Sequence, residues 1–218
     1  MSKVTIIYYT SNREEAKFET KIIHQLRKAS SKIPIISVSH QPLKLGKNIC
    51  LGIHKPTNVL LYHQLLLGCK HATTPFVLSA ESDFLYCPDY FKFIPPKLDQ
   101  IYRYNHIRLM YKYHWGFFRK KYSEGAQIVG RKFLISFLED KLKGIDMFDE
   151  NPSNRQFNAY AGGIPLEMYG GELACVTFKT GNSLHKFTKV ERERSLHELP
   201  YWGSVIDMRK TMFNLQPT

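Results

Sequence analysis

The sequence predicts an α/β protein with a mostly parallel central sheet flanked by helices, and three observations lead to this prediction. Residues 4–39 have the pattern of a strand, a helix and a second strand, an order that predicts a parallel pair joined by a crossover helix. A further helix and strand cover residues 59–80. Two carboxylates, Glu81 and Asp83, follow that strand directly. Ligands of open α/β sheets bind beyond the carboxyl ends of the strands, so this position is also the predicted site.

The first three elements are defined by local patterns. Residues 4–9 are β-branched and aromatic, as in a buried strand. Ser11 or Asn12 is expected to cap the next helix, which runs from about residue 14 to residue 29. Residues 33–39 form the second predicted strand because they are rich in isoleucine and valine.

The next elements lead to the acidic pair. A loop containing Gly46 and Gly52 is expected first. Residues 56–58 then cap a predicted helix from about residue 59 to residue 70, and the apolar run 75–80 reads as a buried strand.

The second half of the chain has fewer clear signals. It is predicted to contain a helix at residues 131–142, a final strand at 173–178, an aromatic turn at 199–203 and a short helix near 204–212.

Length and composition are those of an ordinary globular protein. A chain of 218 residues with 43% hydrophobic residues is expected to form one domain. No stretch approaches the roughly 20 apolar residues of a membrane span, and the N-terminus lacks the apolar core of a signal peptide. The four cysteines show no metal-binding spacing and are expected to be reduced and mostly buried. These features predict a cytoplasmic location.

The charge is strongly positive. The chain carries 31 Lys and Arg residues against 19 Asp and Glu residues, and its net charge is +12. Residues 101–143 hold ten of the basic and three of the acidic residues, interleaved with ten aromatic residues. This balance favours a polyanionic partner such as nucleic acid or an anionic membrane surface. The alternative is a solvated basic surface over an aromatic core, as the alternation of Tyr102, Tyr104, Tyr111 and Tyr113 in a strand would give.

The segment Glu81-Ser82-Asp83 is the strongest indication of chemistry. An acid-x-acid pair at the end of an apolar strand suits a hard divalent cation that keeps several waters and bridges the phosphates of a nucleotide. The same pattern also occurs as a solvated turn.

In order and spacing, these segments resemble the GT-A glycosyltransferases, in particular small family-2-like enzymes of bacteriophages that modify DNA. The similarity is best over residues 4–95, and no single motif is diagnostic. The segments that carry it are residues 6–12, 35–39, 46–50, Asn58 with Gln64, 74–83 and, more loosely, 123–129 and 199–203. The resemblance implies a single GT-A domain over residues 1–218, with a donor-binding half at 1–95 and an acceptor-binding half at 96–218. If the chain is phage-encoded, its location is the host cytoplasm.

The resemblance implies a nucleotide-sugar donor, with a UDP-sugar as the first expectation, and Mn²⁺ or Mg²⁺ as the cofactor. Asp83 is the expected direct metal ligand. This chain has Glu81 where the family pattern begins with aspartate, so Glu81 is expected to contact the metal through water or to hold the ribose. The implied donor-binding residues are Tyr9, Thr10, Ser11, Asn12, Asn58, Gln64 and Glu81.

A second metal ligand is expected near the C-terminus, and His185 and His197 are the candidates. In the family a histidine precedes the glycine of a motif like Thr180-Gly181-Asn182, and this chain has Thr180 in that place. The alternative is fixed positive charge on the pyrophosphate from Lys179, Lys186 or Lys189.

An inverting transferase also needs a general base within reach of the acceptor hydroxyl. Glu124 is the candidate, with Asp149 and Glu150 as runners-up. The alternative role for Glu124 is a capping or salt-bridged residue near Lys120 and Lys121, and a retaining enzyme would need no such base.

Charge and resemblance together predict DNA carrying a hydroxymethylated pyrimidine as the acceptor. The predicted acceptor-binding residues are Trp115, Arg119, Lys120 and Lys121. One alternative is transfer to a surface polysaccharide or a lipid-linked sugar at an anionic membrane. Another is a non-enzymatic nucleic-acid-binding module. A nucleotidyltransferase is a third, but residues 10–13 match its Gly-rich phosphate loop poorly.

Overall fold

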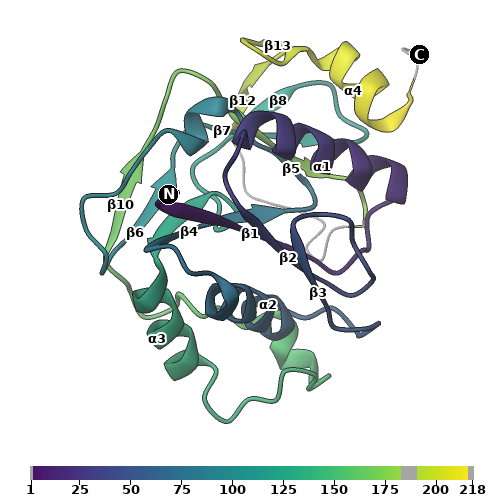
Figure 1. Ribbon diagram of the computed structural model, residues 1–218. Helices are drawn as coiled ribbons and strands as arrows, with labels where there is room; N and C mark the ends of the chain where they lie inside the picture. The colour runs from purple at the N-terminus through teal and green to yellow at the C-terminus, as the bar shows by residue number, and fades with distance from the viewer. Residues whose placement is uncertain (1, 183–190, 216–218) are drawn as a thin grey trace.

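The computed structural model describes residues 2–182 and 191–215, and its centre is a sheet of seven strands (Figure 1). From one edge to the other, the strands are β10 (Leu166–Tyr169), β6 (Ile101–Tyr104), β9 (Gln127–Gly130), β4 (Phe76–Glu81), β1 (Val4–Thr10), β2 (Ile35–Ser39) and β3 (Lys47–Cys50). Strands β4, β1, β2 and β3 are parallel to one another, β10 is parallel to β6, and β9 runs antiparallel to β4 and β6. The predicted mostly parallel sheet is therefore confirmed.

Helices cover both faces of this sheet because β1 is apolar on both of its faces. The helices are α1 (Ala16–Ser30), α2 (Asn58–His71), α3 (Arg131–Lys141) and α4 (Val205–Phe213). Ile6 and Tyr8 of β1 belong to one core cluster together with α1, whereas Ile7 and Tyr9 belong to a second cluster with α2 and α3. Figure 1 shows α1 on one side of the sheet and α2 with α3 on the other. A strand buried on both faces reads as a continuous apolar run, which is the pattern of residues 4–9.

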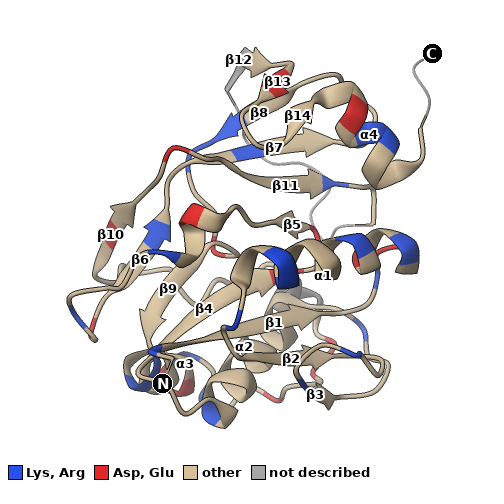
Figure 2. Ribbon diagram, turned by 45° about the horizontal axis from the view of Figure 1, so that its top comes forward, with Lys and Arg blue, Asp and Glu red and all other residues tan. Residues whose placement is uncertain are grey.

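A second sheet of five strands begins directly beyond the C-terminal end of β4 (Figure 2). In spatial order its strands are β12 (Glu191–Leu196), β8 (Phe117–Lys120), β7 (Ile107–Tyr111), β11 (Cys175–Lys179) and β5 (Phe84–Leu85). The smaller elements are the 3₁₀ turns η1 (Pro88–Phe91) and η2 (Pro152–Arg155) and the strand pair β13 (Glu198–Leu199) and β14 (Gly203–Ser204). In the second sheet, β11 lies beside the acidic segment that follows β4, and Phe178 N of β11 donates to Asp83 O at 2.8 Å.

Most of the predicted elements are confirmed within two residues. This holds for β1, α1, β2, α2, β4, α3 and α4. Thr57 caps α2 as predicted, since Leu60 N donates to Thr57 Oγ1 at 3.0 Å. The aromatic turn is confirmed between β13 and β14, where Trp202 N donates to Leu199 O at 3.2 Å.

The predicted cap of α1 is wrong. The N-cap residue is Glu15, which makes no side-chain cap hydrogen bond. Asn12 instead adopts a left-handed backbone conformation with φ 51°, and its Oδ1 accepts from His40 N at 3.0 Å and from Gln41 N at 2.9 Å. Asn12 therefore ties the end of β1 to the end of β2.

The loop predicted around residues 46–52 contains the edge strand β3. Its sequence Lys-Asn-Ile-Cys has a single large apolar residue, so it lacks the pattern by which strands are recognised. Pairing with β2 and a side-chain ladder define it instead, because Asn48 Nδ2 donates to Ser37 Oγ at 3.0 Å and to Ser39 Oγ at 2.8 Å. The strand predicted as the final one is β11, and β12 follows it, so that part of the prediction is wrong.

The aromatic residues of the basic segment are partly core. Tyr102, Tyr104 and Phe117 are at most 1% exposed, which agrees with the alternative that treats these residues as interior. The four cysteines are free; Cys50 is exposed and the other three are buried. No helix in the described part of the chain is long and apolar enough to cross a membrane.

Candidate functional site

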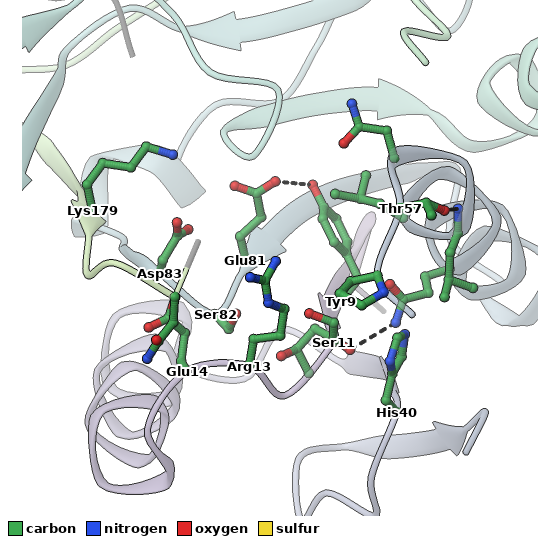
Figure 3. Close-up of a pocket in the computed structure, with 17 residues that line it drawn as sticks. Tyr9, Ser11, Arg13, Glu14, His40, Thr57, Glu81, Ser82, Asp83 and Lys179 are labelled. Carbon is green, nitrogen blue, oxygen red and sulfur yellow. Dashed lines mark hydrogen bonds between the residues drawn. The ribbon is translucent and has the colours of Figure 1, made fainter. Parts of the chain in front are cut away.

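A cavity of about 190 Å³ lies at the carboxyl ends of β1 and β4 (Figure 3). The two strands are parallel neighbours, and Tyr9 is the register partner of Glu81, so their C-terminal ends meet at one edge of the sheet. We call this the strand-end cavity. Its lining includes the predicted residues Tyr9, Thr10, Ser11, Asn58, Gln64, Glu81 and Asp83. The sheet topology thus assembles most of the site that the sequence indicates.

Glu81 is held in a fixed position. Its Oε1 accepts from the Tyr9 hydroxyl at 3.0 Å, and its backbone N–H donates to the Tyr86 hydroxyl at 3.0 Å. The same Tyr86 hydroxyl donates to Gly125 O at 2.6 Å. A Cβ at Gly125 would lie 2.1 Å from Glu81 Oε2, so the close approach requires glycine there. Glu81 is therefore a positioned carboxylate, in contrast to the alternative of a solvated turn.

Three carboxylates share this edge of the sheet. The pKa of Glu81 is raised to about 7, first by burial and second by the charge of Asp83. Burial also raises the pKa of Asp83, against the opposing effect of Lys179. Glu14, from the loop between β1 and α1, lines the same cavity, and its pKa is raised to about 7, mainly by burial. Sequence analysis missed Glu14 because it reads as an ordinary acid at the start of a helix.

Basic side chains accompany these carboxylates. Lys179, at the end of β11, and Arg13 line the strand-end cavity, and Figure 3 shows both among the acidic side chains. Burial lowers the pKa of Lys120, and the charges of Glu81 and Asp83 act against that effect. A site with both signs of charge can hold a cation and an anionic phosphate group together.

The amide side chains named from the sequence have different roles. Gln64 is buried, and its Nε2 donates to Thr10 O at 2.9 Å and to Val38 O at 3.2 Å, which joins the ends of β1 and β2. Asn58 Nδ2 donates to Phe157 O at 2.9 Å. Asn12 is not among the residues that line the strand-end cavity.

One wall of the strand-end cavity was not anticipated. It consists of His40, Pro56, Thr57, Leu60 and Leu61. Burial lowers the pKa of His40, which favours the neutral imidazole. The available signal was the position of His40 directly after the second predicted strand, at the same sheet edge as Tyr9.

A second cavity of about 510 Å³ adjoins the first, and we call it the tyrosine cavity. Glu124 lines it, and its Oε2 accepts from the Tyr62 hydroxyl at 2.8 Å. Arg103 Nη2 lies 3.8 Å from Glu124 Oε1, and its guanidinium also faces the rings of Tyr122 and Tyr160. The two cavities share the lining residues Tyr9, Asn58, Leu61, Glu81 and Lys179. A carboxylate with aromatic neighbours therefore lies next to the strand-end cavity.

The four residues predicted to bind an acceptor are not brought together. Alternation along β8 places Lys120 in the tyrosine cavity and its neighbours Arg119 and Lys121 in a separate hollow of about 770 Å³. We call this hollow, which Arg108 and His106 also line, the basic groove. Trp115 lines none of the three hollows, and the Arg209 guanidinium lies 4.0 Å from its ring centre.

The basic residues are also more dispersed than the sequence suggested. In Figure 2, Lys and Arg lie on α1, α3 and α4 as well as on β7 and β8. Arg103 is 6% exposed and belongs to the interior beside Glu124. The positive charge of residues 101–143 therefore does not form one continuous face.

Of the two histidines proposed as metal ligands, only His197 is among the described residues, and it does not reach the site. His197 is exposed between β12 and β13 and lines none of the three hollows, and His185 lies outside the described residues. Among the residues described, no group of three or more His, Cys, Asp or Glu side chains is arranged to hold a metal. The runners-up for the base, Asp149 and Glu150, are exposed and do not line the tyrosine cavity.

The residues present still fit a hard divalent cation. Carboxylate oxygens are the preferred ligands of Mg²⁺ and Mn²⁺, and one or two of them suffice when waters and phosphate oxygens complete the shell. Glu81 and Asp83 supply such oxygens. In addition, Glu14 Oε2 is buried without a hydrogen-bond partner in the described structure.

Comparison with known proteins supports the fold. No protein family and no curated protein matches this sequence. Among solved structures, S. aureus TarS 1-349 is similar at 14% identity, with a TM-score of 0.53 over 83% of this chain and 62% of that one. A longer S. aureus TarS structure gives 14% identity and a TM-score of 0.52 over 81% of this chain and 37% of that one. The chain thus spans less than two thirds of either structure. These similarities show the fold, and the prediction of a GT-A glycosyltransferase fold is confirmed.

Proposed function

We propose that this protein is a metal-dependent glycosyltransferase that moves a sugar from a nucleotide-sugar donor, a UDP-sugar in the first instance, to an acceptor hydroxyl. The observation that carries the proposal is the pair of adjoining cavities. Glu81 and Lys179 line both, Asp83 lies in the first and Glu124 in the second. A transferase needs this arrangement because donor and acceptor must meet at one reacting centre.

The strand-end cavity suits the donor. Tyr9, Thr10 and Ser11 line the part of the cavity at the end of β1. The wall that contains His40 and Leu61 offers an apolar surface and an imidazole ring against which the nucleobase of the donor can pack. Asp83 would hold the divalent cation, with Glu81 beside it, and the cation when bound would neutralise charge on the diphosphate leaving group. Lys179 adds a fixed positive charge beside the same group.

The tyrosine cavity suits the acceptor. Glu124 is oriented by the Tyr62 hydroxyl and by Arg103, so one of its oxygens is directed to a defined place. In the proposed reaction Glu124 takes the proton of the acceptor hydroxyl as the hydroxyl oxygen bonds to the anomeric carbon of the sugar. The bond from that carbon to the diphosphate breaks, and the nucleoside diphosphate leaves. Tyr122, Phe157 and Tyr160 line the cavity and provide ring surfaces on which a planar or sugar ring can stack.

For the acceptor itself we propose DNA carrying a hydroxymethylated pyrimidine. A base extruded from the duplex would enter the aromatic cavity, and the basic groove would contact the backbone phosphates. The tyrosine cavity and the basic groove lie on either side of β8, since Lys120 lines the cavity while its neighbours Arg119 and Lys121 line the groove. The net charge of +12 supports a polyanionic partner.

Thermal unfolding with nucleotides tests the donor site. We expect the melting temperature to rise with one nucleoside diphosphate, UDP first, and to rise further with Mn²⁺, because only ligands of the native state stabilise it. A ligand at about 100 times its Kd should add about 2.7 kcal/mol. The absence of a shift with every nucleoside diphosphate and nucleotide sugar, with or without Mn²⁺, would reject the donor site and favour a nucleic-acid-binding module.

Charge reversal in the basic groove tests the DNA acceptor. Replacing Arg119 and Lys121 by glutamate should weaken duplex binding and reduce the slope of log K against log salt by about one unit for each lost phosphate contact. Replacing the exposed residues Lys28 and Lys132 by glutamate changes the net charge equally, away from the groove, and should have little effect. Equal losses in both double variants would indicate only a general effect of charge. Binding to anionic vesicles with no binding to duplex DNA would indicate a membrane-associated acceptor instead.

A further inference from the structure

Glu14 is a buried acid for which the proposed mechanism has no use. It lies on the loop between β1 and α1 and is 9% exposed. Its Oε2 is buried and has no hydrogen-bond partner among the residues that the structure describes. An unpaired buried carboxylate oxygen is costly, and a ligand in the cavity that contacts this oxygen would offset the cost.

The side chain of Glu14 lies at the end of the strand-end cavity that Asp83 also lines (Figure 3). Glu14, Asp83 and Lys179 all line this cavity, and the charge of Asp83 adds to the effect of burial in raising the pKa of Glu14. Figure 3 shows Glu14 and Asp83 next to each other at one end of the cavity, with Arg13 and Ser82 beyond them. The carboxylates of Glu14 and Asp83 therefore face a common space from two different elements.

A role for Glu14 in capping α1 does not account for this arrangement. Helix α1 begins at Ala16, and its N-cap is Glu15, which makes no side-chain cap hydrogen bond. Glu15 is exposed and pairs with Lys112 at 3.1 Å. Of these two adjacent glutamates, Glu15 faces solvent and Glu14 faces Asp83.

The charges around Glu14 are compatible with a bound cation. Arg13 partly offsets its negative charge, but burial and the charges of Asp83 and Glu19 act in the opposite direction. Two neighbouring carboxylates repel when both are ionised, and either a proton on one of them or a positive charge between them relieves the repulsion. A divalent cation supplies that charge and accepts an oxygen from each.

We propose that Glu14 is the second protein ligand of the divalent cation, together with Asp83, and takes the place that the sequence suggested for a histidine. This inference rests on the proposed function, since the cation is the one that accompanies the nucleotide. The two carboxylates would hold the cation, and diphosphate oxygens and water would supply the remaining oxygen ligands. Glu81, whose Oε1 already accepts a hydrogen bond from the Tyr9 hydroxyl, would then lie beside the metal as a positioning residue and not as a ligand.

Binding of Mn²⁺ in the presence of UDP, followed by the electron paramagnetic resonance signal of free Mn²⁺, tests this ligand set. Glu14→Gln keeps the shape of the side chain and removes its charge, and it should weaken Mn²⁺ binding at least about tenfold, as Asp83→Asn should. Glu15→Gln makes the same change one residue away and should leave the affinity unchanged. Glu14→Asp, which withdraws the carboxylate by one methylene, should also weaken binding and replaces the first variant if that one does not fold.

The outcomes distinguish a failure of the Glu14 assignment from a failure of the proposed function. If Glu14→Gln binds Mn²⁺ as tightly as the unsubstituted protein while Asp83→Asn does not, Glu14 is not a ligand, and the proposed function stands. If the unsubstituted protein binds UDP but no Mn²⁺, the ligand set and the metal dependence are both rejected. The metal-free melting temperature of Glu14→Gln should be equal to or higher than that of the unsubstituted protein, since an uncompensated buried charge has been removed.

Discussion

Asp83→Asn should lower sugar transfer by about 10³-fold, which corresponds to about 4 kcal/mol of transition-state stabilisation. The asparagine side chain has nearly the same shape but no charge, so it holds a divalent cation poorly. The fold should be retained because Asp83 contributes its backbone oxygen, not its side chain, to the contact with Phe178. The measurement is kcat/KM for transfer, or for donor hydrolysis if the acceptor is unknown.

The matched control for this substitution is Asp149→Asn. Asp149 is exposed, and its Oδ1 accepts from Asn151 N at 2.9 Å, a bond that an asparagine oxygen can also accept. Its activity should equal that of the unsubstituted protein. A second readout is the melting temperature with UDP, which should lose its dependence on Mn²⁺ in Asp83→Asn only. Full turnover by Asp83→Asn would remove Asp83 from the metal site.

Much of the lining of the strand-end cavity could be predicted because its residues follow from local patterns. Residues 4–9 and 75–80 are short apolar runs, and each is followed at once by polar or acidic residues. Once both are parallel strands of one sheet, their ends must meet, and the register of Tyr9 with Glu81 is the result. No long-range information is needed beyond the topology.

The tyrosine cavity depends on packing between distant segments. Tyr62 of α2 orients Glu124, and Arg103 of β6 lies beside the same carboxylate. Arg103 looked like one more surface cation because the sequence gives no sign that it is interior. The division of Arg119 and Lys121 from Lys120 likewise requires knowing that β8 is a strand, since alternation then sends neighbours to opposite faces.

Two further residues illustrate the same limit. Glu14 lies in a stretch that predicts an exposed first turn of a helix, and it becomes part of the cavity because the end of β11, with Lys179, packs there. The N-terminal cap of α1 was predicted wrongly for a related reason. Asn12 has the right type and position for a cap, but the backbone N–H groups at the end of β2 are its actual partners.

Glu124→Gln should lower kcat by about 10²- to 10⁴-fold, because the glutamine amide cannot take a proton from the acceptor hydroxyl. The Tyr62 hydroxyl can still donate to the amide oxygen, so the geometry of the cavity should be kept. The KM for the donor should change little, since Glu124 lines the tyrosine cavity and not the strand-end cavity. Steady-state kinetics with saturating donor measures both values.

The control is Glu150→Gln, which removes the charge of the exposed runner-up that pairs with Lys55 at 3.8 Å. It should leave kcat unchanged. The rise in melting temperature with UDP and Mn²⁺ should be the same in Glu124→Gln as in the unsubstituted protein, because the donor site is intact. A low kcat with a normal nucleotide shift therefore assigns Glu124 to the acceptor step. A normal kcat would instead mean that proton removal does not depend on Glu124, as in a retaining mechanism, and the tyrosine cavity would then serve only to bind the acceptor.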